Sequence, residues 1–138
     1  MISDLAIVPL INLIGISSND ECKQQAAELL GLLARNPASK SAIADGGGIA
    51  KLLALLNSDK VLAVELAAGA LAAIATENPD MQRQVAQGGA IPTLVALARS
   101  MSNFRASASA MAALTQLNAL EENRALIREA GGESIVSG

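Results

Sequence analysis

Residues 89–97 read GAIPTLVAL, and a closely similar stretch, GGIAKLLAL, occupies residues 47–55. The two stretches begin 42 residues apart, and the same apolar spacing recurs once more near the start of the chain. Three apolar series follow this period: Ile7, Ile49 and Ile91; Leu10, Leu52 and Leu94; Leu13, Leu55 and Leu97. A fixed period of about 40–47 residues with helical patterning is typical of an α-solenoid, in which stacked helical units share a continuous core.

Glycine and Asn-Pro pairs mark the boundaries of helices in the same 42-residue frame. Asparagine favours the residue before a helix, and proline is tolerated in its first turn. Glycine supplies the sharp bend after a helix. The recurring positions are Gly47, Gly89 and Gly131, the aliphatic residues Ile43, Val85 and Ile127 four positions before them, and the pairs Asn36-Pro37 and Asn78-Pro79. Each unit is therefore expected to contain a short helix, a glycine bend, a medium helix, a polar turn and a long helix.

The long helix of the central unit is expected over residues 60–76. Within it Ala67, Leu71 and Ile74 lie at i, i+4 and i+7, which places them on one buried face. The matching triplets in the other units are Ala26, Leu30 and Leu33, and Ala110, Leu114 and Leu117. Their offsets are 41 and 43 residues, so the connecting loops vary by one residue while the packing positions are kept. Ser18 and Glu21 have the spacing of a capping box at the first long helix.

Composition narrows the class of protein. Hydrophobic residues make up 51% of the chain and aromatic residues only 1%, so alanine and leucine dominate and favour closely packed helices. The net charge of −3 arises from interspersed acidic and basic residues without a basic run, which argues against nucleic-acid binding. No apolar run reaches the length of a membrane span, and residues 1–14 lack the features of a signal peptide. We therefore expect neither a nucleic-acid partner nor a membrane.

Few residues suited to catalysis or metal binding are present. The chain contains no histidine, which removes the commonest general base and metal ligand. Cys22 is the only cysteine; it is expected to be a small buried side chain, and a reducing compartment, the cytoplasm or the nucleus, is the simplest location. We expect no enzyme, no catalytic residues, no metal and no cofactor.

The unit resembles the armadillo repeat. Residues 89–97 resemble the second helix of that repeat, residues 85–88 the end of its first helix, and residues 67–75 its third helix, except at one asparagine. The resemblance covers the whole chain and implies an all-α, right-handed solenoid. We expect a single domain, 1–138, of about three three-helix units (1–46, 47–88 and 89–130), with 131–138 beginning another. Both ends are expected to be cut within a repeat.

The resemblance also implies a binding site. In the importin-α type of armadillo protein, the third helices line a concave groove in which asparagine side chains hold a peptide backbone and tryptophans receive basic side chains. The asparagine positions correspond here to Leu32, Ala73 and Gln116, and the tryptophan positions to Glu28, Gly69 and Ala112. The further groove positions are Gln24, Arg35, Glu65, Thr76, Ala108 and Ala119. Neither asparagine nor tryptophan is kept, so binding through the usual ladder is not expected.

A groove lined by alanine and glycine leaves two interpretations open. Either binding occurs elsewhere in a parent protein, or the small residues admit an apolar helix of a partner. The first function we expect is a non-catalytic module that binds a protein or peptide segment in the groove. The alternatives are self-association through uncapped ends and an excised or engineered scaffold. Phe104 is expected in the core, and the segment 107–109 close to the groove.

Overall fold

The structure is a computed structural model that describes residues 2–16, 19–100 and 102–137. The helices of these segments are α1 (Ile2–Ile16), α2 (Asp20–Leu33), α3 (Pro37–Asp45), α4 (Gly48–Leu55), α5 (Val61–Ala75), α6 (Pro79–Gln87), α7 (Ala90–Ala98), α8 (Phe104–Asn118), α9 (Glu121–Glu129) and α10 (Glu133–Ser137). The all-α prediction is confirmed, and the long helix expected over 60–76 is α5.

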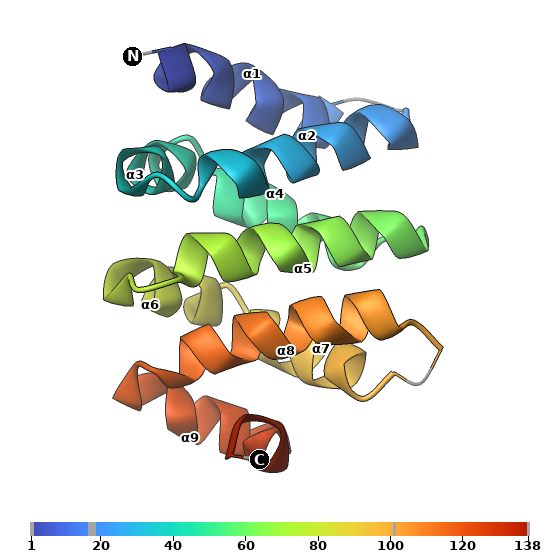
Figure 1. Cartoon of the computed structure of the whole chain (residues 1–138), viewed down its shortest axis with the longest axis vertical. Coiled ribbons are helices and arrows are strands. Elements are labelled where there is room, and N and C mark those ends of the chain that lie inside the picture. Colours follow the sequence, from blue (N-terminus) through green and yellow to red (C-terminus); the bar gives the residue numbers. More distant parts are fainter. Residues whose placement is uncertain (1, 17–18, 101, 138) are drawn as a thin grey trace.

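The helices form a single stacked array (Figure 1). The long helices α2, α5 and α8 lie one below the other on one side, with α5 packed between its two counterparts. The helices α4 and α7 lie behind them, and α3, α6 and α9 cross at the end where the long helices finish. The long helices therefore share one face of the array, and their carboxyl ends share one edge.

The boundaries of the helices follow the local signals in the sequence. Asn36 and Asn78 cap α3 and α6: each side chain accepts a hydrogen bond from a backbone N–H of the first turn, and proline follows. Gly47, Gly89 and Gly131 have φ between 82° and 88°, a left-handed conformation that L side chains rarely adopt. The predicted glycine bend is therefore present at all three positions.

The core consists of small and aliphatic side chains. Ala67, Leu71 and Ile74 are completely buried, as are Ala110, Leu114 and Leu117 of α8. Leu33 of the first triplet is only half-buried. Alanine at the contact points lets neighbouring long helices approach closely, which explains how a core without aromatic residues can be filled.

Three buried polar side chains on α3, α6 and α9 donate hydrogen bonds to carbonyl groups at the ends of the long helices. Lys40 Nζ donates to the Thr76 carbonyl at 2.5 Å, and Gln82 Nε2 donates to the Ala75 carbonyl at 2.9 Å. Asn123 Nδ2 donates to the Leu117 carbonyl and to the Gln82 carbonyl, both at 3.1 Å. The Lys40 bond supplies a donor to a carbonyl group beyond the carboxyl end of α5. The Ala75 and Leu117 carbonyls also accept hydrogen bonds from Asn78 N and Leu120 N, so Gln82 and Asn123 add a second donor to each. We call Lys40, Gln82 and Asn123 the polar edge residues.

Polar groups near this edge differ in how well they are satisfied. Arg83 Nε of α6 donates a hydrogen bond to Glu122 Oε1 of α9 at 3.0 Å, and this hydrogen bond, together with the charge of Glu122, raises the pKa of Arg83 above its usual value. The Ser39 hydroxyl is buried and has no hydrogen-bond partner among the described residues. Burying an unpaired hydroxyl is unfavourable, so the Ser39 hydroxyl lowers the stability of the fold.

Some expectations about single residues were wrong. Phe104 is 79% exposed rather than part of the core, because it lies in the first turn of α8. Val61, at the same place in the first turn of α5, is exposed as well. Cys22 is half-buried rather than buried. Asn19 caps α2 and accepts hydrogen bonds from Glu21 N and Cys22 N, whereas Ser18 of the proposed capping box lies outside the described residues.

Within 2–16, 19–100 and 102–137, no helix combines the length and hydrophobicity needed to cross a bilayer.

Candidate binding groove

The face shared by α2, α5 and α8 is hollow at its centre because two of its helical positions are glycines, which carry no side chain. At Gly31 of α2 an added Cβ would lie 3.3 Å from Ala70 Cα and 3.4 Å from Ala70 Cβ of α5, so the two helices touch there. At Gly69 of α5 the nearest atom to an added Cβ would be Ser109 Oγ of α8, at 3.8 Å. Gly31 therefore sets the approach of α2 to α5, and Gly69 leaves room above α5.

A cavity of about 490 Å³ lies on this face. The lining residues of α2 are Ala27, Glu28, Gly31 and Leu32, with Arg35 from the turn after α2; those of α5 are Glu65, Leu66, Gly69, Ala70 and Ala73; and those of α8 are Arg105, Ala108 and Ser109. The uncharged part of the lining is almost entirely apolar, and Leu32 remains 50% exposed. We call this cavity and its lining residues the groove.

Four charged residues belong to the lining of the groove. Glu28 lies on α2, Arg35 in the turn after α2, Glu65 on α5 and Arg105 on α8. None of these four side chains makes an ion pair or a hydrogen bond with another described residue. Glu28 precedes Arg35 by seven residues, so the acidic group lies on α2 and the basic group lies in the turn beyond its carboxyl end. The groove thus has unpaired charges of both signs around an apolar centre.

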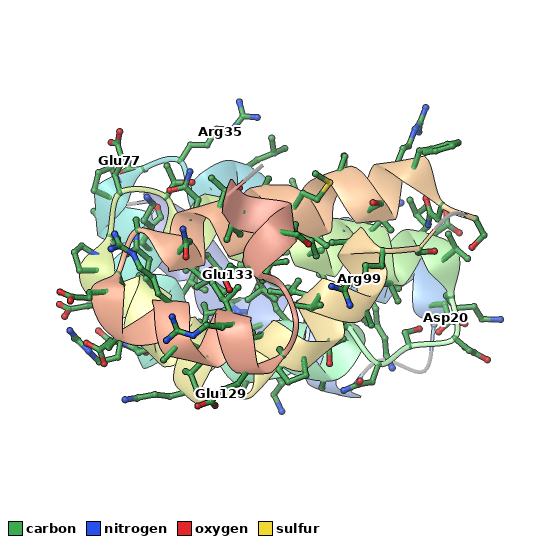
Figure 2. The ribbon with its side chains drawn as sticks, turned by 90° about the horizontal axis from the view of Figure 1, so that it is seen from below. Asp20, Arg35, Glu77, Arg99, Glu129 and Glu133 are labelled. Atoms are coloured by element: carbon green, nitrogen blue, oxygen red, sulfur yellow. The ribbon has the colours of Figure 1, made fainter. Side chains whose placement is uncertain are left out.

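A second cavity, of about 370 Å³, adjoins the groove at the carboxyl ends of α2 and α5. It shares Arg35 and Ala73 with the groove, and its other lining residues are Pro37, Lys40, Thr76, Glu77 and Asn78. Figure 2 shows Arg35 and Glu77 at the same corner of the molecule, both reaching outward. Glu77 has a φ of 52°, a left-handed conformation uncommon for a residue with a side chain. We call this second cavity the end cavity.

Comparison with solved structures places this array among known folds. An engineered protein is 29% identical over 94% of this chain with a TM-score of 0.89, and a designed armadillo repeat protein, crystallised with the peptide (KR)4, is 23% identical over 94% with a TM-score of 0.87. The armadillo repeats only protein of Plasmodium falciparum is 21% identical over 94% with a TM-score of 0.84. The chain has the armadillo-repeat fold. It spans 53%, 54% and 61% of the length of these three proteins. No protein-family model matches it, and no curated protein sequence matches it significantly.

The structure brings together most of the side chains that the armadillo resemblance placed in the groove. Glu28, Leu32, Arg35, Glu65, Gly69 and Ala73 all line it, as does Ala108. Thr76 lines the end cavity instead, and its hydroxyl donates to the Ala72 carbonyl. Gln24, Ala112 and Gln116 line neither cavity, and neither does Ala119. The two cavities therefore occupy the α2–α5 part of the armadillo face and the first half of α8.

Several lining residues were not predicted from the sequence. Arg105 lies three residues before Ala108 and four before Ser109, so extending the predicted stripe of α8 by one turn would have found it. The segment 107–109 was expected near the groove; Ala108 and Ser109 line it, whereas the Ser107 hydroxyl donates to the Ala98 carbonyl. Gly31 and Ala70 mark a contact between helices, and their sequence positions alone do not reveal it.

The chemistry that this armadillo face offers is recognition by shape and charge. The lining holds carboxylates, guanidinium groups and one serine hydroxyl. Within the described part of the chain, no group of three or more His, Cys, Asp or Glu residues is arranged to hold a metal ion. Such a surface suits an apolar segment of another chain with charged groups at its ends.

Proposed function

We propose that this chain is a non-catalytic protein-interaction module that binds a segment of another protein in the groove. The observation that carries the proposal is the open apolar centre at Gly69 and Leu32, surrounded by four charges that have no partner among the described residues. If this face packed against another part of the chain, its guanidinium and carboxylate groups would be paired and its apolar side chains would be covered. The complex of the designed armadillo repeat protein with the peptide (KR)4 supports peptide binding in this fold.

The charges of the groove predict the order of groups in the partner. A basic group would lie against Glu28 and Glu65, and an apolar group would cover Gly69 and Leu32. Phe104, in the first turn of α8 beside Arg105, is exposed and would add an aromatic contact at the border of the groove. The partner is therefore expected to present basic and apolar groups about one helical turn or a few extended residues apart.

Selection from a displayed library of random 12-residue peptides tests the proposal, followed by measurement of Kd for the enriched peptides. Gly69→Trp fills the centre of the groove, where a Cβ meets nothing closer than 3.8 Å. Ala96→Trp, at an exposed position of α7 outside both cavities, is the matched control. We expect Gly69→Trp to weaken binding at least tenfold and the control to leave it unchanged. Equal binding by both variants, or no enrichment at all, would rule out the groove as a peptide site.

Self-association is the alternative, and exposed apolar residues of α1 favour it. Val8 and Leu13 are exposed on this helix, whereas Leu10 of α1 and Ile135 of α10 pack against the core. A self-associating chain would show a mass above 14.0 kDa in light scattering that falls on dilution and on substitution of Val8 and Leu13 by serine. A monomer at all concentrations would leave the groove proposal standing alone.

The cytoplasm or the nucleus is the compartment we propose. The single cysteine, half-buried and unpaired, is compatible with a reducing environment. Imaging of the tagged chain in cells would test this, and secretion or a pattern confined to an organelle other than the nucleus would contradict it.

A further inference from the structure

The ammonium group of Lys40 is buried with fewer partners than it can accommodate. The residue is only 7% exposed, and its one hydrogen bond goes to the Thr76 carbonyl at 2.5 Å. An ammonium group has three donors, and no carboxylate of the described residues pairs with this one. The carboxyl end of α5 offsets part of the charge through the helix dipole. The remaining donors and the rest of the charge have no partner within the described chain.

The fold does not require a positive charge at this place. Gln82 and Asn123 occupy the corresponding positions of α6 and α9, are equally buried, and donate to carbonyl groups with neutral amides. A neutral amide thus performs the structural task at lower desolvation cost than an ammonium group. The charge of Lys40 is therefore in excess of what packing and hydrogen bonding demand.

A space suited to an anion lies beside this ammonium group. The end cavity has Lys40 and Arg35 in its lining, and the Arg35 guanidinium makes no ion pair or hydrogen bond with a described residue. Glu77 is the one acidic side chain of the lining, and it pairs with neither cation. Two cations around one cavity, one from the turn after α2 and one from α3, can bind both oxygens of a carboxylate, with the guanidinium acting in a bidentate manner.

We propose that the end cavity is a carboxylate subsite, in which Lys40 and Arg35 bind a carboxylate group of the segment that lies in the groove. The inference rests on the proposed function, because Arg35 and Ala73 line both cavities and one bound segment would pass from one into the other. The partner segment then carries a basic group near Glu28 and Glu65, an apolar group near Gly69, and a carboxylate at the carboxyl ends of α2 and α5. The carboxylate comes from an Asp or Glu side chain or from a chain terminus.

The test uses labelled, carboxyl-amidated peptides from the library selection and the variant Lys40→Gln, which copies the residue found at position 82. Each acidic residue of a peptide is replaced by its amide in turn, and Kd is measured for both proteins. We expect one replacement to weaken binding to the original chain about tenfold and to weaken binding to Lys40→Gln less than twofold. Omitting the carboxyl amidation shows whether a chain terminus can supply the carboxylate instead. Arg128→Gln, which removes an exposed positive charge on α9, is the control for general electrostatics and is expected to leave Kd unchanged.

A second probe decides the matter if no peptide binds. Capped glutamate, N-acetyl-glutamate methylamide, is titrated while the backbone amide resonances of Thr76 and Glu77 are followed by NMR. A saturable shift in the original chain that is absent from Lys40→Gln supports the subsite even if the groove proposal fails. Peptides that bind with no coupling between an acidic residue and Lys40, or the absence of any saturable shift when no peptide binds, would overturn it. Should Lys40→Gln fail to fold, the exposed Arg35→Gln takes its place.

Discussion

Replacing Gly69 by alanine should stabilise the chain, whereas replacing Gly31 should not. Both glycines lie inside long helices, where glycine costs about 1 kcal/mol relative to alanine. At Gly69 the added methyl group meets only Ser109 Oγ, at 3.8 Å, so the full gain in helix propensity is available. At Gly31 it meets the backbone Cα of Ala70 at 3.3 Å, which can yield only if α5 moves relative to α2.

The size of the effect follows from the length of the chain. Unfolding entropy of about 2.1 cal/mol/K per residue gives roughly 0.29 kcal/mol/K for a chain of 138 residues. A gain of about 1 kcal/mol should then raise the Tm of Gly69→Ala by roughly 3 °C. For Gly31→Ala the close contact should cancel this gain or reverse it.

Far-UV circular dichroism is the suitable assay, because the chain has no tryptophan or tyrosine to report by fluorescence. Urea and thermal unfolding of the two variants are compared with those of the original chain. Equal stabilisation by both substitutions would refute the close approach of α2 and α5 at Gly31. Destabilisation by Gly69→Ala would refute the open space above α5, and with it the shape of the groove.

Three further predictions concern stability and use the same assay. Leu71→Ala, in the core of α5, should cost about 2–5 kcal/mol, whereas Leu32→Ala, half exposed in the groove, should change stability by less than about 0.5 kcal/mol; similar values for the two would contradict the assigned burial. Asn123→Ala removes two buried side-chain hydrogen bonds, each worth about 0.5–1.5 kcal/mol, and should cost about 1–3 kcal/mol, so a neutral result would remove its structural role. Ser39→Ala deletes a buried hydroxyl without a partner and should stabilise by about 1 kcal/mol; a loss of stability would show that the hydroxyl is satisfied after all.

The helices could be predicted because each boundary has a local chemical cause. Asn-Pro pairs begin α3 and α6, and glycine in a left-handed conformation separates α6 from α7. The stripe Ala67, Leu71 and Ile74 identified the buried face of α5 correctly. The repeat also identified buried positions, because one apolar residue says little about its own burial, whereas three in register indicate a shared environment.

The exposure of Phe104 could have been predicted from its position in the repeat. Aromatic residues are usually buried, and this general tendency placed Phe104 in the core. Its counterpart at the start of α5 is Val61, which is exposed as well. The position in the repeat therefore decides burial here more than the identity of the residue.

The polar edge residues escaped notice for a different reason. Lysine, glutamine and asparagine look unrelated, although they stand 42 and 41 residues apart. What they share is the task of donating to a carbonyl group at the end of a long helix, which becomes visible only when the helices are placed in space. The depth of the groove was likewise beyond prediction, since it depends on the distance between α2 and α5 at Gly31 and Ala70.

The polar edge residues also determine how the array can deform. The Lys40 bond to Thr76 and the Asn123 bond to the Gln82 carbonyl each join neighbouring units at the edge where the long helices end. At the opposite edge, α2 and α5 are joined by the exposed pair Asp20 and Lys60, 4.0 Å apart, which contributes little to rigidity. Buried hydrogen bonds between neighbouring units are thus found at the edge where the long helices end, and a weak exposed ion pair is found at the edge where they begin. Thermal bending should separate the beginnings of α2, α5 and α8, which would widen the groove at Arg105 while the end cavity keeps its dimensions.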